Sequence, residues 1–517
     1  MYQNNGAVKK CAPRKPKNIE APRIYPIGID LGTTYSSVAV YRDGTAEVIP
    51  DKNGDRLIPS IVFFDPLSGK PTVGKSAINL GVRCPANCLK DAKRIIGRKF
   101  DDDYISRVCN LKTTDFMLAR WTDDSTVYQL TIGGRKSFKT PEEVIAHILV
   151  YLKQMASEYL NTKVKEVVVA IPAHFSISQR LAMKKAVELA GLKLLKFISE
   201  TSAGALHYIR DTNKVSKILA FDWGGGKIDV SAIILKDKIF EVKAVAGNTL
   251  LGGTDIDERL LKFHSGCFTS RIKHRLMKGC VDLKHQLSSN SEYSVTIDCY
   301  DGLNDLNLVL SRSELEDINK DIIQKVINTI DLCVDDAGWT IDSIDELALL
   351  GGSTRMPKIR EQVMTKFPGV TMRSDFNPDE AVAAGACLEA FWIRNPSKSN
   401  CKMIHATPLS IGLECYGHFM DVFIERNSSL PVKKSKRFRT SENYQENVTF
   451  KIYEGDRENC LHNYKLGEFN IYGLPPMKAG EFEFIVTFVM DHNGFLKIEA
   501  SEDSDGETNN LLIKTVI

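Results

Sequence analysis

The chain has 517 residues, of which 43% are hydrophobic, 26% charged and 8% aromatic, as in an ordinary globular protein with room for about two to four domains. Its formal net charge of +3 is too small to indicate binding to nucleic acid or to an anionic membrane surface. No apolar run approaches the length of a membrane span. The twelve cysteines form no CxxC pair, which argues against a zinc site and favours a reducing compartment such as the cytoplasm.

The first 24 residues differ from the rest in charge. They hold six lysines and arginines against one acidic residue, Glu20. They lack the apolar segment of a secretory signal. We predict a disordered basic arm over residues 1–24.

One motif occurs twice, over residues 27–40 and 219–231. In each copy an apolar strand ends on an aspartate, Asp30 or Asp222, and a glycine-rich turn leads into a second strand. Glycine lets the backbone approach an anion closely, and a carboxylate supplies a hard oxygen for Mg²⁺. A single copy could be an ordinary hairpin. Two copies with matched aspartates predict two turns that hold a triphosphate from both sides.

The segments between the two motifs alternate in type. Residues 140–160 predict a helix, because Thr140, Pro141 and Glu143 form a helix-start pattern. Residues 166–171 predict a strand in the middle of a covered sheet. A helix over 178–190 and a strand over 194–198 follow. This alternation is typical of an α/β fold.

The second half of the chain again alternates helix and strand, and its last part changes to strands only. We predict a single long helix over 313–338, and a buried strand over 346–350 that leads into a Gly-Gly turn. Such a turn lets a ligand ring lie against bare backbone with Arg355 stacked on it, although it is also compatible with a plain strand-to-helix turn. Residues 396–401 are polar and predict a linker. Beyond them the hydrophobic period is two, which predicts an antiparallel β-sandwich.

Five segments together resemble the seventy-kilodalton heat-shock chaperones. They are Asp-Leu-Gly-Thr-Thr-Tyr-Ser at 30–36, Asp-Ala-Lys-Arg-Ile-Ile-Gly-Arg at 91–98, Gly-Gly-Ser-Thr-Arg-Met-Pro-Lys-Ile at 351–359, Asn-Pro-Asp-Glu-Ala-Val-Ala at 377–383 and Thr-Pro-Leu-Ser-Ile-Gly at 407–412. The resemblance implies an α/β actin-like (ribonuclease H-like, duplicated) ATPase domain over 25–395, an interdomain linker over 396–406 and a β-sandwich peptide-binding domain over 407–517. The family's C-terminal helical lid is expected to be absent.

The resemblance also implies roles for single residues. Asp30 and Asp222 would hold Mg²⁺ through water, Glu200 would join them, and Lys93 would orient the attacking water. From its own segment alone, Lys93 would be expected on a solvated basic face. The ATP or ADP contacts implied are Gly32, Thr33, Thr34, Tyr35, Gly224, Gly225, Gly226, Lys227, Lys284, Ser288, Gly352, Ser353, Arg355 and Asp379.

The peptide-binding cleft of the family falls on six apolar positions of the sandwich. An ordinary sandwich core would produce the same alternation, and without the resemblance we would prefer that explanation. The implied positions are Leu413, Tyr416, Phe419, Phe438, Val448 and Phe450.

Departures from the family pattern occur in the nucleotide site and in the linker. Lys227 stands where the family has threonine and is expected to enter the phosphate site, Val281 replaces the ribose-binding glutamate, and His285 replaces the base-stacking arginine. In the linker, Lys402 replaces a leucine and is expected to disfavour docking into an apolar groove. His405 and Lys196 replace an ion pair with two potentially like charges, which predicts weakened coupling between the domains.

The sequence therefore favours an ATP-dependent chaperone that binds apolar segments of unfolded proteins and hydrolyses Mg-ATP slowly. The resemblance implies J-domain proteins and nucleotide exchange factors as further partners, and neither nucleic acid nor membrane is expected. One alternative is a non-hydrolysing nucleotide-binding adaptor or regulator, which Lys227 and Val281 favour. Another is a sugar kinase of the same superfamily, against which the β-sandwich argues.

Overall fold

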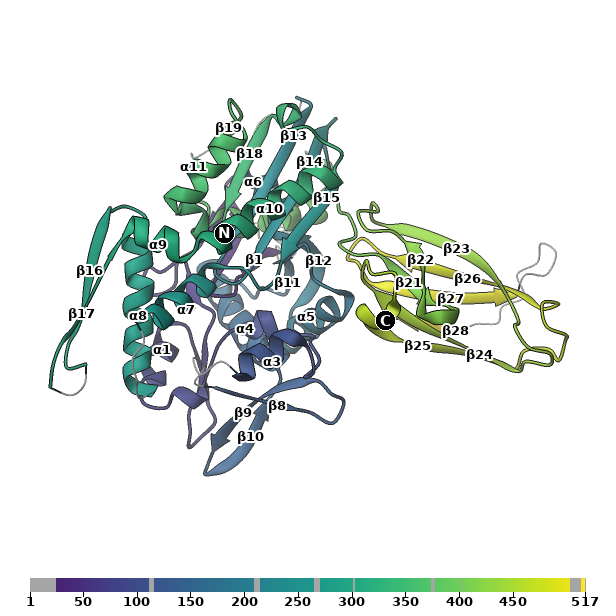
Figure 1. Ribbon diagram of the computed structural model, residues 1–517, viewed down its shortest axis with the longest axis horizontal. Helices are drawn as coiled ribbons and strands as arrows, with labels where there is room; N and C mark the ends of the chain where they lie inside the picture. The colour runs from purple at the N-terminus through teal and green to yellow at the C-terminus, as the bar shows by residue number, and fades with distance from the viewer. Residues whose placement is uncertain are drawn as a thin grey trace, which may run out of the picture.

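The computed structural model describes residues 25–110, 116–208, 214–264, 270–300, 303–372, 377–399, 401–502 and 513–516. The basic arm predicted for residues 1–24 lies outside the described residues. A large α/β body and a smaller β domain lie side by side in Figure 1. None of the described helices is long and apolar enough to cross a membrane.

The first lobe of the large body is built on a sheet of mixed direction. The strand order is β12-β11-β1-β2-β3, with β4 paired to β2. β1 runs parallel to β11 and antiparallel to β2, so the first glycine-rich turn joins two neighbouring strands. The strands are β1 (Ile27–Leu31), β2 (Tyr35–Arg42), β3 (Thr45–Val48), β4 (Ile58–Pro59), β11 (Glu166–Ile171) and β12 (Lys193–Ser199).

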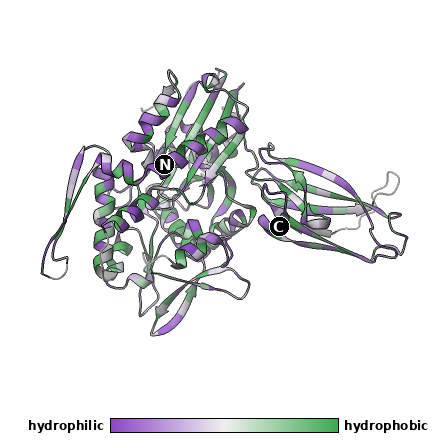
Figure 2. Ribbon diagram, in the orientation of Figure 1, coloured by the Kyte–Doolittle hydropathy of each residue, from purple (hydrophilic) through white to green (hydrophobic). Residues whose placement is uncertain are grey.

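The second lobe repeats this arrangement. Its sheet has the order β19-β18-β13-β14-β15-β20, in which β13 runs parallel to β18 and antiparallel to β14. The second glycine-rich turn therefore occupies the same place as the first. The strands are β13 (Ser216–Trp223), β14 (Ile228–Lys236), β15 (Ile239–Asn248), β18 (Glu346–Leu350), β19 (Thr371–Met372) and β20 (Lys402–Ile404). Figure 2 shows hydrophobic residues concentrated on the strands inside the large body.

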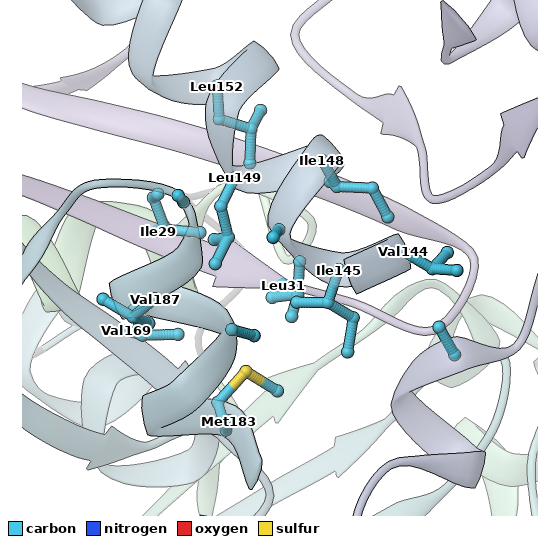
Figure 3. Packing of buried hydrophobic residues seen from close by; sticks show 14 of the residues in the cluster. Ile29, Leu31, Val144, Ile145, Ile148, Leu149, Leu152, Val169, Met183 and Val187 are labelled. Atoms are coloured by element: carbon cyan, nitrogen blue, oxygen red, sulfur yellow. The ribbon is translucent and has the colours of Figure 1, made fainter. Parts of the chain in front are cut away.

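The helices pack apolar faces against these sheets. Among the described helices, three starts carry capping boxes with a serine or threonine cap: Thr140 with Glu143, Ser176 with Gln179 and Ser311 with Glu314. In the first lobe, leucine and isoleucine side chains from α4 meet Ile29 of β1 and the side chains of α5 (Figure 3). The helices are α1 (Lys75–Gly81), α2 (Ala92–Ile95), α3 (Asp103–Asn110), α4 (Pro141–Tyr159), α5 (Ile177–Leu189), α6 (Glu200–Tyr208), α7 (Gly253–Phe263), α8 (Ser270–Gln286), α9 (Arg312–Ile318), α10 (Lys320–Asp336), α11 (Pro357–Lys366) and α12 (Ala381–Arg394).

Two helices, α6 and α12, pack closely through small residues. A Cβ atom added at Gly385 would fall 1.8 Å from the carbonyl oxygen of Ala203, so only glycine permits this approach.

The single helix predicted over 313–338 is wrong. The segment forms α9 and α10, which are separated at Asn319. The side chain of Asn319 is buried, and its amide donates to the carbonyl oxygen of Leu315 at 2.8 Å. A side-chain amide that bonds nearby backbone competes with regular helix, which explains the break.

Smaller sheets lie at the edges of the large body. The hairpin of β16 and β17 projects from it at the left of Figure 1. The strands are β5 (Val62–Phe64), β6 (Pro71–Val73), β7 (Cys88–Leu89), β8 (Met117–Arg120), β9 (Thr126–Ile132), β10 (Arg135–Lys139), β16 (Glu292–Ile297) and β17 (Leu306–Ser311).

The C-terminal domain consists of two four-stranded antiparallel sheets, with the orders β22-β21-β24-β25 and β23-β26-β27-β28. Its core is rich in phenylalanine, and the rings of Phe423 and Phe488 stack with centroids 4.2 Å apart. An actin-like α/β fold followed by an antiparallel β-sandwich is therefore confirmed. The strands are β21 (Ile411–Glu414), β22 (Met420–Ile424), β23 (Val432–Arg439), β24 (Asn447–Glu454), β25 (Tyr464–Tyr472), β26 (Glu483–Met490), β27 (Leu496–Glu502) and β28 (Ile513–Val516).

The connection between the domains is docked rather than loose. Residues 396–398 form a 3₁₀ turn, and β20 then pairs in parallel with β15 of the second lobe. The side chain of Met403 is buried, whereas that of Lys402 is exposed. The expectation that Lys402 disfavours docking is wrong, because alternation along the strand directs its ammonium to solvent.

The structure shows how the predicted repulsion between His405 and Lys196 is relieved. Lys196 donates to the carboxylate of Glu389 at 2.5 Å, so its charge is paired within the large body. Burial, together with the positive charges of Lys196 and Arg180, holds the pKa of His405 well below its ordinary value. His405 is therefore neutral and carries no charge that could repel Lys196.

The sandwich contacts both lobes. Asn493, in the turn between β26 and β27, accepts a hydrogen bond from the backbone N–H of Phe197 at 2.9 Å. Arg180 of α5 donates to the carbonyl oxygen of Asn493 at 3.2 Å. On the second lobe, Asn427 accepts from the N–H of Val245 at 3.1 Å. These contacts explain why the β domain lies against the α/β body (Figure 1).

Candidate functional site

The two glycine-rich turns face each other across the lobes. A Cβ atom added at Gly225 would fall 2.1 Å from the hydroxyl oxygen of Thr34, and one at Gly226 would fall 2.6 Å from that of Thr33. The close approach requires glycine on one side and a small polar residue on the other. The paired arrangement predicted from the repeated motif is thus present.

Arg94 fixes the second turn from the first lobe. Its guanidinium donates to the carbonyl oxygen of Gly226 at 3.0 Å, to the hydroxyl of Thr254 at 3.2 Å and to the carboxylate of Asp255 at 3.1 Å. Sequence reasoning did not assign a role to Arg94, Thr254 or Asp255. The available signal was the place of Arg94 beside Lys93 in the segment 91–98.

Lys93 is buried, with an exposure of 5%, and its ammonium contacts the carboxylate of Glu200, whose exposure is 4%. A solvated basic face is therefore excluded for this residue. Lys93 comes from the short helix α2 and Glu200 from the start of α6. The fold brings together two residues that lie 107 positions apart in the sequence.

Lys227 lies at the centre of a cluster of carboxylates. Its ammonium is 2.8 Å from Glu200 and 2.9 Å from Asp222, and it also contacts Asp229 directly. Its exposure is 6%. Lys227 was expected to enter the phosphate site, and its side chain extends to Glu200 and Asp222, two residues predicted for the same site. Asp229 was not singled out from the sequence, because nothing in a strand pattern marks an inward-facing aspartate as part of a site.

The buried charges perturb one another. Burial and the neighbouring Glu200 raise the pKa of the Asp30 carboxyl above its ordinary value. Although burial acts in the opposite direction, the ammonium groups of Lys227 and Lys93 lower the pKa of Glu200. The surrounding carboxylates raise the pKa of Lys227 despite its burial. Lys227 is therefore a permanent cation at neutral pH.

These carboxylates do not fit a magnesium ion while Lys227 lies among them. Glu200, Asp222 and Asp229 each place one oxygen within 4.8 Å of the others, a spacing that suits a cation. Mg²⁺ requires oxygen ligands at about 2.0–2.1 Å in octahedral geometry. The ammonium of Lys227 occupies the space between the same oxygens. Asp30 differs, because its Oδ1 is buried without a hydrogen-bond partner among the described residues.

A second group of predicted residues surrounds the Gly-Gly turn. The ammonium of Lys284 donates to the carbonyl oxygen of Gly253 at 3.1 Å and lies 2.7 Å from Asp257. Ser353 donates to the carbonyl oxygen of Gly224 at 3.0 Å, which joins this turn to the second phosphate turn. Ser288 lies one helical turn beyond Lys284, just after the end of α8.

Arg355 pairs with Asp379 at 2.6 Å, and a Cβ added at Gly352 would fall 3.3 Å from the same carboxylate. The Arg355 side chain is half exposed, so its planar face can receive a ligand ring. The nucleotide-binding residues predicted in this part of the chain thus lie close together.

The six apolar positions assigned to a peptide cleft are not brought to one surface. Tyr416 and Phe419 are exposed, Phe438 and Val448 are partly buried, and Leu413 is fully buried. Phe450 is buried as well and stacks on a neighbouring ring of the sandwich core. In this conformation only the first two are open to a partner.

Comparisons with known proteins agree with the geometry. The family model described as Hsp70 protein matches residues 26–516. A ribosome-associated molecular chaperone of Eremothecium gossypii is 36% identical over 508 residues, which cover 95% of this chain and 82% of that protein. A heat shock 70 kDa protein of Neurospora crassa is 36% identical over 504 residues, covering 94% of this chain and 77% of that protein. The chain has a duplicated α/β body with facing glycine turns, followed by a β-sandwich. It belongs to the Hsp70 family.

Proposed function

We propose that this protein is an ATP-dependent chaperone that binds exposed apolar segments of unfolded polypeptides and hydrolyses ATP slowly. Members of the Hsp70 family are ATPases and bind nucleotide with Mg²⁺. The observation that carries the proposal is the buried contact between Lys93 and Glu200, next to the two facing glycine turns. A buried ion pair of this kind is costly unless it serves geometry or chemistry.

In this proposal Lys93 orients the water that attacks the terminal phosphate. A fixed cation stabilises the negative charge of the transferring group, and its position has to be set before the reaction. Glu200 supplies that position, because it binds the Lys93 ammonium through one oxygen and Lys227 through the other. Thr33 and Thr34, on the facing turn, offer hydroxyl groups to the phosphates.

The test is ATP turnover by the wild type, Lys93→Ala and Lys99→Ala. Lys99 is the matched control, because it follows in the same segment but is exposed and donates only to the carbonyl oxygen of Asp123. Removal of a transition-state cation is expected to reduce turnover by a factor of about 10²–10³. The control is expected to retain the wild-type rate. Equal background turnover in the wild type and Lys93→Ala contradicts hydrolysis by this site.

A second candidate is a nucleotide-binding adaptor or regulator that does not hydrolyse ATP. The observation that favours it is the position of Lys227 among Glu200, Asp222 and Asp229. This candidate predicts measurable binding of ADP and ATP without turnover. Binding calorimetry combined with the turnover assay separates the two candidates.

The proposed partners are extended polypeptides, with J-domain proteins and nucleotide exchange factors as co-chaperones, and the proposed location is the cytoplasm. An extended apolar peptide can bind through main-chain hydrogen bonds and side-chain pockets. Tyr416 and Phe419 are the exposed aromatic residues from which such binding would start. Tyr416→Ala is therefore expected to weaken capture of a fluorescent apolar peptide.

A further inference from the structure

Lys227 is placed by the second glycine turn itself. It follows Gly226 and immediately precedes β14, which begins at Ile228. Its backbone thus lies at the entrance of the phosphate turn, while its side chain extends to the carboxylates of β13 and α6. The long, unbranched side chain of lysine reaches the carboxylates from this position. The shorter side chain of threonine does not extend that far.

The Lys227 ammonium donates to Asp222 at 2.9 Å and to Asp229, and it forms an ion pair with Glu200 at 2.8 Å. A lysine ammonium has three N–H donors and no acceptor. Three carboxylate oxygens, one each from Glu200, Asp222 and Asp229, surround it. A phosphate oxygen would therefore have to compete with three carboxylates for this ammonium.

Both carboxylate oxygens of Glu200 also have cationic partners. One of its oxygens contacts Lys93 and the other lies 2.8 Å from Lys227. A divalent ion bound at about 2 Å to the Asp222 oxygen that Lys227 contacts would lie within about 5 Å of the ammonium, which is 2.9 Å from that oxygen. Two positive charges at that distance in a buried site repel each other strongly. At these oxygens the lysine and a directly bound metal therefore compete for one place.

We infer that Lys227 is a tethered cation that takes the place of a bound divalent ion, so that the protein binds adenine nucleotides without requiring free Mg²⁺. This inference deepens the proposed nucleotide site and rests on it. The competing possibility is that Lys227 leaves the cluster when nucleotide binds. That movement would leave three buried carboxylates without their shared partner, which is costly unless a metal replaces the ammonium.

The first experiment measures metal binding without nucleotide. The probe is Mn²⁺, whose free concentration is followed by electron paramagnetic resonance on the full chain. The wild type is expected to bind no Mn²⁺ at this cluster, whereas Lys227→Thr opens the carboxylates and is expected to bind one ion. Lys236→Thr, at the exposed far end of the same strand, is the control and is expected to behave as wild type. Equal Mn²⁺ binding by the wild type and Lys227→Thr overturns the inference.

The second experiment measures ADP affinity by calorimetry with Mg²⁺ or with EDTA. For the wild type the two dissociation constants are expected to differ by less than about fivefold, and for Lys227→Thr by more than that. A wild-type difference of about fivefold or more overturns the inference. Lys227→Gln, which keeps most of the side-chain volume, replaces the threonine variant if the latter does not fold.

Failure of the proposed function and failure of this inference give different results. If the wild type binds no nucleotide at all, the proposed function fails, but the Mn²⁺ comparison still decides whether Lys227 blocks the cluster. If nucleotide binds only with Mg²⁺, the proposed function stands and the inference is wrong.

Discussion

A carboxylate oxygen of Glu454 accepts a hydrogen bond from the backbone N–H of Ile177 at 3.1 Å, although the two residues belong to different domains. Ile177 is the first residue of α5, and Glu454 is the last residue of β24 in the sandwich. The first N–H groups of a helix lack partners within the helix, and its N-terminus attracts negative charge. The sandwich therefore supplies part of the cap of a helix in the first lobe.

Removal of this contact is expected to loosen the interface between the domains. A buried backbone N–H left without a partner costs about 1–3 kcal/mol, so Glu454→Ala is expected to accelerate amide exchange at Ile177 by about fivefold or more. Hydrogen–deuterium exchange over residues 174–181 measures this. Glu446→Ala, an exposed glutamate just before the same strand, is the control. Unchanged exchange in Glu454→Ala contradicts a role for the contact.

The same contact makes docking depend on pH. Burial raises the pKa of Glu454 to about 7, although the Ile177 N–H and Arg180 lower it. The pKa of Glu454 in the docked state is higher than that of an exposed glutamate. At a pH between these two pKa values, the docked state therefore binds more protons than the undocked state. Docking is therefore expected to strengthen as the pH falls from about 7 toward about 4.5 and to be weakest above about 7.

Small-angle X-ray scattering between pH 5 and 8 tests this dependence, since undocking increases the radius of gyration. The wild type is expected to expand as the pH rises. Glu454→Gln cannot ionise and is expected to show a flatter profile. If the radius of gyration changes with pH in the same way in both proteins, titration of Glu454 does not cause the change.

Docking of the linker is expected to depend on Met403 and not on Lys402. A carboxylate at the buried position 403 has to be desolvated, whereas the same change at the exposed position 402 does not. Met403→Asp is therefore expected to abolish stimulation of ATP turnover by an apolar peptide, and Lys402→Asp to preserve it. The readout is the ratio of turnover with and without peptide. Equal ratios in both variants and the wild type would show that peptide stimulation of ATP turnover does not depend on β20.

The core of the first lobe yields a prediction on stability. Leu149 of α4 is fully buried and packs with Ile29 and its neighbours (Figure 3). Leu149→Ala is expected to lower the free energy of unfolding of this lobe by about 2–5 kcal/mol, because it leaves a cavity. Leu189→Ala, on an exposed position of α5, is the control and is expected to change it by less than about 0.5 kcal/mol. Urea denaturation followed by circular dichroism measures both.

Local patterns predicted much of the fold, because the responsible interactions are local. The capping box at Thr140 involves residues three positions apart, and the two glycine turns each join neighbouring strands. The break at Asn319 was missed because the hydrophobic period continues through it. Only the structure shows that the buried amide of Asn319 donates to the carbonyl oxygen of Leu315.

The parts of the site that could not be predicted depend on contacts distant in sequence or on side-chain direction. The partner of Lys196 is Glu389, 193 residues away, so no local pattern indicated that its ammonium is paired. Lys227 was placed correctly in the second turn, but the sequence does not determine whether its side chain extends to a ligand or into the protein. The attraction of three buried carboxylates decides this.

The most direct test of an ATP-dependent chaperone is the release of a bound apolar peptide. A fluorescent peptide is bound to the full chain, and its dissociation rate is measured before and after ATP is added. Couplings between sites are typically about 1–3 kcal/mol, so ATP is expected to accelerate release by at least about fivefold. The docked linker and the contacts of the sandwich with both lobes provide the physical connection. A dissociation rate that ATP leaves unchanged would contradict the account.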